Sequence, residues 1–207
     1  MVDIHSAAAL LVVDVQNDFC PGGALEVPEG DEVVPVINRI SSLFPLVIAT
    51  QDWHPEEHIS FASRHPDSTP FSVMRIKDMQ QVLWPDHCVA GTKGADFHPD
   101  LDLKPVRFVI RKGADRDMDS YSAFLENDHK TSTGLAGLLR ELGVKRIFVT
   151  GLATDYCVRA TAIDGREAGF QVTVIETACR PVDQPPGSLK SALAEMRERG
   201  VTILPTL

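Results

Sequence analysis

The sequence lacks an apolar run long enough to cross a membrane, since a spanning helix needs about 20 consecutive apolar residues. Its apolar opening, residues 7–13, is far shorter. This stretch has no basic flank before it and no small-residue cleavage pattern after it, so it differs from a secretion signal. We therefore expect an untargeted cytoplasmic protein without a membrane partner, in which residues 7–13 belong to a buried strand.

Cysteine is scarce and widely spaced. The four cysteines are Cys20, Cys88, Cys157 and Cys179, and no two of them form a Cys-x-x-Cys pair. This spacing excludes a zinc ribbon and a dense disulfide scaffold. We expect free thiols in a reducing compartment, which agrees with a cytoplasmic location.

Positive charge is also in short supply. The chain has 20 lysine and arginine residues against 29 aspartate and glutamate residues, a formal net charge of -9. Binding to nucleic acid or to an anionic membrane depends on clustered lysine and arginine, and no segment supplies such a cluster. A small-molecule partner is therefore favoured, and assembly into a homo-oligomer stays open.

Internal repeats, low-complexity tracts and glycine- or serine-rich linkers are absent as well. The 207 residues suffice for one large domain, which at this size buries roughly 70% of the surface of the unfolded chain. With 43% hydrophobic and 24% charged residues, the composition is that of an ordinary globular protein. We predict a single domain over residues 1–207.

The chain does contain a regular alternation of two apolar patterns. Runs rich in β-branched residues, typical of strands buried on both faces, alternate with apolar residues spaced three and four apart, typical of helices. Gly143 and Gly200 follow two of the helical patterns and suit the left-handed position at a helix end. This alternation predicts a three-layer α/β fold, in which helices cover both faces of a mostly parallel six-stranded sheet. The predicted strands are 8–14, 46–50, 107–111, 146–150, 171–175 and 201–204, and the helical patterns cover 33–44, 135–142 and 189–196.

In open parallel sheets, functional sites form beyond the carboxyl ends of the strands. Asp14 ends the first apolar run, where partial burial raises the pKa of a carboxyl group and suits it to proton transfer. An aspartate in a turn or at a helix start is the alternative interpretation. Asp14 is thus a candidate base that needs partners from other strand ends.

The second strand end carries a candidate metal site. Asp52 and His54 are two residues apart, so in an extended segment both side chains project to the same side. His87 lies in an apolar stretch, where an imidazole needs a hydrogen-bond partner or a metal. One carboxylate and two imidazoles suit zinc, iron or manganese, although an Asp-x-His pair in a loop is commonly just solvated. His58 and Ser60 are further candidates for this site.

Lys112 follows the predicted strand 107–111 and is placed to lean into the same crevice, whereas a surface lysine is the commoner outcome. Four acids come next, with much of the spacing of a calcium-binding EF-hand loop. A strand precedes them instead of a helix, and serine occupies the position that requires glycine, so we reject a calcium site. We expect a polar, solvated loop to contain these acids, which are Asp115, Asp117, Asp119 and Glu126.

The stretch after the strand 146–150 places Cys157 close to the expected start of a helix. Thr154 and Asp155 are both good N-cap types, so a helix beginning there has Cys157 in its first turn. The positive end of the helix dipole lowers the pKa of a thiol in that position and favours the nucleophilic thiolate. A small buried cysteine of the core is the alternative. The strand ends together thus present a base, a lysine, a thiol and a metal pair.

Five motifs, in this order, resemble one known family. They are VDVQNDF, QDWH, WPDHCVAGT, RKG and GLATDYCV, spread between about residues 8 and 180. Their combination resembles the isochorismatase-like cysteine hydrolases and, among them, the nicotinamidase/pyrazinamidase group. The resemblance implies the isochorismatase-like α/β fold and hydrolysis of nicotinamide to nicotinate and ammonia through a cysteine thioester, a step of NAD salvage. It also implies activity on pyrazinamide.

The resemblance further implies a role for each residue of the thiol cluster. Cys157 would be the nucleophile, Asp14 the general base, and Lys112 the residue that orients and stabilises Asp14. The peptide bond between Leu152 and Ala153 would be cis, and the backbone amides of Ala153 and Cys157 would form an oxyanion hole.

Asp52, His54 and His87 match the ligands with which this group holds one divalent metal, commonly zinc or iron, against the ring nitrogen of the substrate. Family members without the metal motif act on other substrates, so the intact motif points to nicotinamide. A related amidase acting on a different small amide, or a binding module without activity, is the alternative. Four aromatic residues match positions around the substrate ring, with core packing as the other explanation: Phe19, Trp84, Tyr121 and Tyr156.

Overall fold

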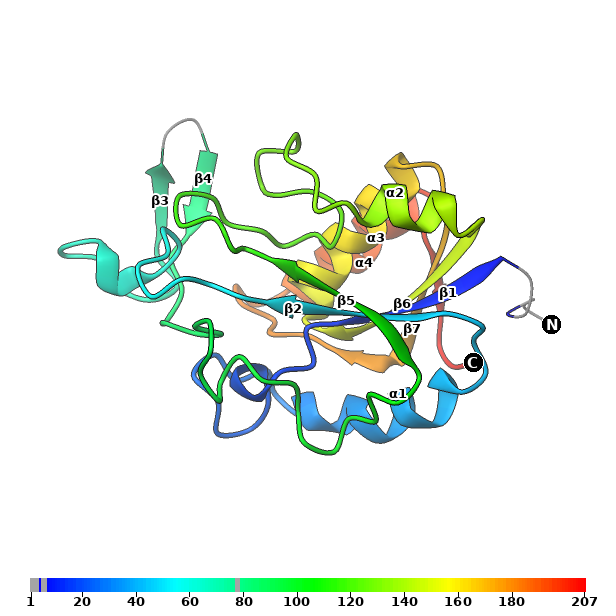
Figure 1. Ribbon diagram of the computed structural model, residues 1–207. Coiled ribbons are helices and arrows are strands. Elements are labelled where there is room, and N and C mark those ends of the chain that lie inside the picture. The colour runs from blue at the N-terminus through cyan, green and yellow to red at the C-terminus, as the bar shows by residue number, and fades with distance from the viewer. Residues whose placement is uncertain (1–3, 5–6, 77–78) are drawn as a thin grey trace.

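The structure, a computed structural model, describes residues 4, 7–76 and 79–207. Within these residues, six strands form one sheet in the order β5-β2-β1-β6-β7-β8, and every neighbouring pair is parallel (Figure 1). The predicted six-stranded sheet is therefore confirmed. Residues 1–3, 5–6 and 77–78 of the predicted domain lie outside the described residues. The strands are β1 (Ala8–Val13), β2 (Val47–Asp52), β5 (Val106–Lys112), β6 (Arg146–Leu152), β7 (Gln171–Arg180) and β8 (Thr202–Leu204).

Helices cover the two faces of this sheet, which gives the predicted three layers. Helix α1 lies on one face, and α2, α3 and α4 lie on the other (Figure 1). Gly143 and Gly200 follow α2 and α4 with φ angles of +70° and +78°, the left-handed conformation that glycine adopts without strain. Among the described residues, no helix combines the length and apolar character that crossing a membrane requires. The helices are α1 (Val33–Ser41), α2 (Leu135–Glu141), α3 (Arg159–Glu167) and α4 (Ser188–Glu198).

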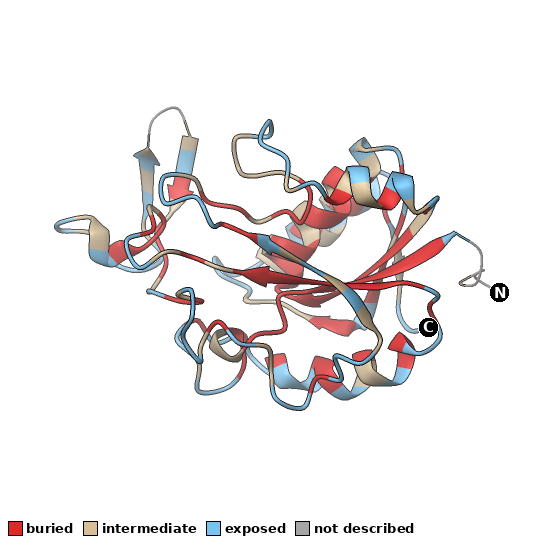
Figure 2. Cartoon of the chain, viewed as in Figure 1, coloured by how far each residue is buried: buried red, intermediate tan, exposed pale blue. Residues whose placement is uncertain are grey.

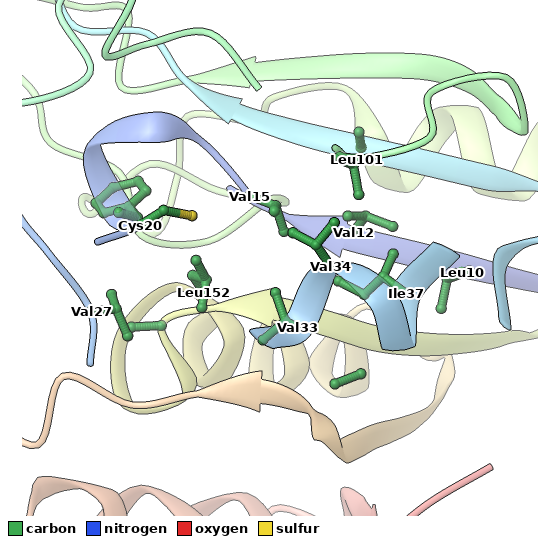
Figure 3. Packing of buried hydrophobic residues seen from close by; sticks show 14 of the residues in the cluster. Leu10, Val12, Val15, Cys20, Val27, Val33, Val34, Ile37, Leu101 and Leu152 are labelled. Atoms are coloured by element: carbon green, nitrogen blue, oxygen red, sulfur yellow. The ribbon is translucent and has the colours of Figure 1, made fainter. Parts of the chain in front are cut away.

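The central strand β1 packs against both helical layers, because successive residues of a strand point to opposite faces. Leu10 and Val12 belong to the cluster on the α1 side, together with Val34 and Ile37 (Figure 3). Leu11 belongs to the cluster on the opposite side. β1 and β2 are buried along their whole length (Figure 2), which explains why β1 is a continuous apolar run and β2 begins as one, before its polar end at residues 50–52 reaches the site.

A small antiparallel hairpin is an addition that the sequence patterns do not indicate. Strands β3 (Val73–Ile76) and β4 (Met79–Val82) pair with each other and project from the body near the carboxyl ends of the main strands (Figure 1). Gln80 and Gln81 interrupt the apolar alternation of β4, so its sequence resembles a loop. The hairpin is tied to the body through Gln81 of β4, whose side-chain amide donates to the Asp119 carboxylate.

Short turns of other kinds complete the chain. In the part of the chain that the structure describes, three are 3-10 turns, at Asn17–Phe19, Gly30–Glu32 and Ala62–Arg64. A fourth is a π-helical turn at Thr154–Val158, between β6 and α3. This turn contains the thiol of the candidate site.

Candidate active site

The four strand ends named from the sequence meet at one edge of the sheet. In the parallel register, Asp52 at the end of β2 stands beside Lys112 at the end of β5. Asp14 follows β1 directly, and Cys157 lies in the π-helical turn after β6. The common direction of the strands therefore brings together residues that are far apart in the sequence.

Lys112 is the centre of this cluster and is completely buried, so it is not a surface lysine. Its Nζ atom lies 2.9 Å from Asp14 Oδ2 and 3.5 Å from Cys157 Sγ. It also donates to a carboxylate oxygen of Asp52, and to the carbonyl oxygen of Ser120 at 3.0 Å. Burial by itself would lower the pKa of Lys112, but the carboxylates of Asp14 and Asp52 raise this pKa well above its usual value. The side chain is therefore a permanent cation.

Asp14 is a buried carboxyl group with one oxygen held and one oxygen available. The Thr50 hydroxyl donates to Oδ1 at 2.6 Å. Oδ2 faces Lys112 Nζ, but within the described part of the chain it accepts no hydrogen bond of standard geometry. Burial raises the pKa of Asp14 above its ordinary value, against the opposing effect of Lys112. Oδ2 is thus suited to accept a proton.

Cys157 is a buried thiol next to two carboxylates. Its Sγ atom and one oxygen each of Asp14 and Asp52 all lie within 4.8 Å of one another. Burial raises the pKa of Cys157 well above its ordinary value, the two carboxylates raise it further, and Lys112 opposes them. This direction is opposite to the lowered pKa predicted from the helix start, and desolvation by burial is its largest cause. A neutral thiol needs a base to become a nucleophile, and Asp14 lies beside it.

The helical segment that carries the thiol begins at Thr154, as predicted, but neither Thr154 nor Asp155 caps it with a side chain. The Asp155 carboxylate instead accepts hydrogen bonds from the backbone N–H groups of Val182 and Asp183, at 3.0 and 2.9 Å. This arrangement corrects the predicted capping role. Asp155 fastens the loop after β7 to the turn that holds the thiol.

The peptide bond between Leu152 and Ala153 is cis, as predicted. Ala153 and Cys157 both line the pocket described below. The role of their backbone amides as donors to an oxyanion stays a prediction.

Asp52, His54 and His87 form a compact group of three metal-type ligands. The Nε2 atoms of His54 and His87 lie 3.5 and 4.0 Å from Asp52 Oδ2. Their Nδ1 atoms lie 2.8 Å from the carbonyl oxygen of Gly113 and 2.7 Å from that of Pro85. A ring that donates through Nδ1 keeps the lone pair of Nε2 free, and contacts of this kind orient metal-binding histidines. The three residues therefore fit a divalent metal ion.

The charges of this group also suit a cation. Burial and the neighbouring His54 lower the pKa of His87 to about 4, so its ring is neutral at neutral pH. Burial would raise the pKa of Asp52, but Lys112 and His54 hold it below its usual value. Asp52 in turn raises the pKa of His54 against the effect of burial, so a metal and a proton compete for that ring. Ionised carboxylates and neutral imidazoles are the forms that bind metals.

His58 and Ser60 lie next to the group of three ligands, on the side of the His54 ring on which His58 stacks. The buried His58 ring stacks on His54, with the ring centroids 4.1 Å apart. Its Nδ1 atom lies 2.7 Å from Ser60 Oγ, and its Nε2 atom lies 3.0 Å from the carbonyl oxygen of Met118. Because the protein engages both ring nitrogens, His58 supports the His54 ring, and Ser60 holds His58.

Gly113 provides both a carbonyl oxygen for His54 and space for its ring. Its φ angle is +61°, and a Cβ atom added there would lie 2.4 Å from His54 Cε1. We expect Gly113→Ala to displace the ring and to weaken metal binding by at least about tenfold, as loss of an orienting contact does. Elemental analysis of the purified variant and titration with zinc would measure this effect.

Gly143→Ala is the matched control for this experiment. Its φ angle is +70°, so the backbone strain is similar, but no heavy atom lies within 4 Å of the added Cβ. Metal binding that is equal in the two variants would contradict the role given to Gly113.

A pocket opens beside the thiol and the metal-type ligands. Cys157, Asp52 and His87 line its polar end. Leu25, Val27 and other apolar side chains line the rest. All four aromatic residues named from the sequence contribute to the wall: Phe19, Trp84, Tyr121 and Tyr156.

Trp84 joins the aromatic residues to one another. Its Nε1 atom donates to Tyr121 Oη at 3.2 Å, and its ring meets Tyr156 edge-on with centroids 4.9 Å apart. The Tyr156 hydroxyl donates to the carbonyl oxygen of Gln184. These contacts fix the rings, and their flat apolar faces suit a planar ligand.

Asp119 is a residue of this pocket that the sequence patterns do not reveal. The sequence predicts a solvated side chain, yet only 3% of Asp119 is exposed and it lines the pocket. Asp115 and Asp117 are exposed, as predicted. The spacing of the acids does not distinguish Asp119 from the other two, because burial depends on the tertiary path of the loop, which contacts His58 through the Met118 carbonyl group.

A buried cysteine beside a carboxylate and a lysine, at the carboxyl edge of a parallel α/β sheet, is the arrangement of a cysteine hydrolase. Comparison with protein families agrees with this class. A model of the Isochorismatase domain matches residues 8–206. The chain therefore belongs to the isochorismatase family.

Within this family, the chain is similar to nicotinamidases. A nicotinamidase of Acinetobacter baylyi is 51% identical over 193 residues, which cover 93% of this chain and 90% of the relative. A nicotinamidase of Escherichia coli is 45% identical over 199 residues, which cover 94% of this chain and 93% of the relative.

Comparison with solved structures agrees with these sequence similarities. A nicotinamidase and pyrazinamidase of Acinetobacter baumannii superposes with a TM-score of 0.94 at 48% identity, covering 96% of this chain and 95% of its own. A protein of L. infantum in complex with nicotinate has a TM-score of 0.86 at 39% identity, with coverage of 99% and 96%. A pyrazinamidase of Pyrococcus horikoshii in complex with zinc has a TM-score of 0.78 at 40% identity, with coverage of 96% and 98%.

Proposed function

We propose that this protein is a nicotinamidase that hydrolyses nicotinamide to nicotinate and ammonia and also accepts pyrazinamide. The observation that carries the proposal is the position of Cys157, in contact with Lys112 at the polar end of an aromatic pocket. The nicotinamidases at 51% and 45% identity support the choice of substrate. The structural relative that contains nicotinate supports it further.

The first half of the proposed reaction forms a thioester. Asp14 Oδ2 takes the thiol proton while Cys157 Sγ attacks the carboxamide carbon, which makes a C–S bond and an oxyanion. The backbone amides of Ala153 and Cys157 would donate to this oxyanion. When the C–N bond breaks, Asp14 returns the proton to the leaving nitrogen, which departs as ammonia. Lys112 stabilises the carboxylate form of Asp14 between these transfers.

The second half hydrolyses the thioester. Asp14 takes a proton from water as the water oxygen attacks the carbonyl carbon. The C–S bond then breaks, the sulfur recovers the proton from Asp14, and nicotinic acid leaves and ionises to nicotinate. The same carboxylate thus acts as base and acid in both halves.

We also propose that Asp52, His54 and His87 hold one divalent metal, with zinc or iron favoured and manganese as the other option. When bound, the metal would hold the ring nitrogen of the substrate and fix its orientation. The zinc in a pyrazinamidase that is 40% identical to this chain supports this assignment. The free Nε2 lone pairs described above support it independently.

Replacement of a ligand is expected to remove the metal. We expect His87→Ala to lose bound metal and to weaken the binding of nicotinamide, because a site with two remaining ligands is incomplete. Elemental analysis and calorimetric titration would measure the two effects. His65→Ala is a matched control, since the His65 ring bonds to the carbonyl oxygen of Ile59 and not to the ligand group. Unchanged metal content in His87→Ala would refute the assignment.

A comparison of substrates tests the proposed activity itself. Ammonia release would be measured side by side for nicotinamide, pyrazinamide and a ureido or carbamoyl compound of similar size. Nicotinamide should give the highest kcat/KM because its planar ring fits the aromatic wall. A clear preference for the non-aromatic compound would overturn the proposal in favour of another amidase of the same family.

The setting of this activity is part of the proposal. We infer that residues 1–207 act as one domain in the cytoplasm, with a small-molecule substrate and without a nucleic-acid or membrane partner. The four free and buried cysteines support a reducing compartment. The net charge of -9 supports the absence of a polyanionic partner.

A further inference from the structure

Asp119 is a buried acid that neither the proposed reaction nor the three metal ligands use. It lies in the loop after β5, with 3% of its surface exposed, and its side chain borders the pocket beside Asp52 and His87. An aspartate is rarely buried without a compensating partner, because removing an ionised carboxylate from water is costly. Its position therefore requires a reason.

Neutral donors hold the Asp119 carboxylate in place. The Gln81 side-chain amide donates to Oδ2 at 2.6 Å, and the Ser120 backbone N–H donates to Oδ1 at 2.8 Å. Gln81 belongs to β4 and also donates to the carbonyl oxygen of Val82. These bonds fix the direction of the carboxylate, but they bring no opposite charge to it.

The carboxylate lies next to the histidines of the metal-type group. One oxygen of Asp119 and one ring nitrogen each of His54 and His58 all lie within 4.8 Å of one another. Because the protein engages both nitrogens of His58, these three residues do not make a second set of ligands. Asp119 therefore lies close to the ligand His54 without being one of the three ligands Asp52, His54 and His87.

The balance of buried charge points to a cation at this place. Lys112 contacts both Asp14 and Asp52, but its single charge can balance only one carboxylate. When Asp14, Asp52 and Asp119 are all ionised and His54 is neutral, the form that binds a metal, two negative charges remain. A divalent cation on Asp52 and the histidines would neutralise both.

We propose that Asp119 is a positioning residue of the metal centre, whose negative charge, directed by Gln81 and Ser120, strengthens the binding of a divalent cation to Asp52, His54 and His87. This inference rests on the proposed metal site and adds a residue to it. The competing explanation is mechanical: Asp119 only fastens the β3–β4 hairpin to the body through Gln81.

Two variants distinguish the effect of the Asp119 charge from that of its hydrogen bond with Gln81. Asp119→Asn removes the charge and keeps the shape, while Gln81→Met removes the hydrogen bond and keeps the charge. The affinity of the metal-free full-length proteins for Zn²⁺ would be measured by competition with a chromogenic chelator. We expect Asp119→Asn to bind Zn²⁺ about 10- to 100-fold more weakly, the usual effect of an outer partner. Gln81→Met, and Asp117→Asn in the exposed part of the same loop, should bind it as the wild type does.

The shift of thermal unfolding on adding Zn²⁺ gives a second readout that does not depend on activity. The shift should be smaller for Asp119→Asn than for the wild type, because stabilisation by a ligand follows its affinity. Wild-type affinity in Asp119→Asn, or equal losses in Asp119→Asn and Gln81→Met, would overturn the inference. Failure of the wild type to bind Zn²⁺ would overturn the metal site together with it. Normal ammonia release would in either case leave the proposed activity standing.

Discussion

Replacing Cys157 with alanine is expected to abolish ammonia release from nicotinamide, with a fall in kcat of about four orders of magnitude or more. The thiol is the proposed nucleophile, and without it no thioester can form, whatever proton transfers Asp14 still supports. Because the side chain is small and buried, the variant should fold and still bind nicotinamide. A coupled ammonia assay would measure the first effect, and calorimetric titration the second.

Cys179 offers a matched control for this experiment. It is another buried free thiol, and burial raises its pKa to about 12. It pairs with Gly151 in the sheet, on β7, and does not line the pocket. Cys179→Ala should therefore keep most of the activity. Wild-type turnover in Cys157→Ala would rule out the thioester mechanism.

Lys112→Met is expected to reduce both activity and stability. The substitution removes the cation that contacts Asp14 and Asp52 and leaves two carboxylates close together in the interior. Removing one partner of a buried ion pair costs about 3–5 kcal/mol, so the free energy of unfolding should fall by about that amount. Asp14 would then hold its proton, and kcat should fall about 10²- to 10⁴-fold, the contribution of a general base. Urea unfolding and the ammonia assay would measure these effects.

A double variant tests whether the unpaired carboxylates cause the loss of stability in Lys112→Met. Asp14→Asn combined with Lys112→Met removes one of the two carboxylates, so it should unfold at a higher urea concentration than Lys112→Met alone. In both proteins kcat should be at least about 10²-fold below that of the wild type. A double variant that is less stable than the single one would show that lost packing, and not charge, destabilises Lys112→Met.

The sheet and most of its helices could be predicted because buried strands and helix faces require apolar residues in recognisable patterns. β1 is apolar along its whole length, β2 begins with the apolar residues 47–49, and α1 repeats apolar residues at spacings of three and four. The hairpin could not be predicted, since β3 and β4 pair with each other outside the main core and carry no such pattern.

Much of the site could also be located, since residues at the ends of parallel strands must meet. This rule alone selects Asp14, Asp52, Lys112 and Cys157 as neighbours. The rule does not predict how strongly a side chain is desolvated, because desolvation depends on the whole fold. Desolvation reverses the predicted shift in the pKa of Cys157. Nor does it separate Asp119 from exposed acids of the same loop, because the tertiary path of the loop decides their burial.

The parallel pairing of β1 with β6 has a consequence for the synthesis of the chain. The Thr150 hydroxyl bonds to the carbonyl oxygen of Leu11, a residue 139 positions earlier. β1 is the first strand to leave the ribosome, and it cannot pair with β6 until most of the polypeptide has been synthesised. Pairing between segments so far apart in the sequence is slow. Asp14 meets the thiol only at that late stage, because the chain carries its base long before the nucleophile Cys157 has been synthesised. Recovery of turnover during refolding should accordingly report the closing of the sheet around β1.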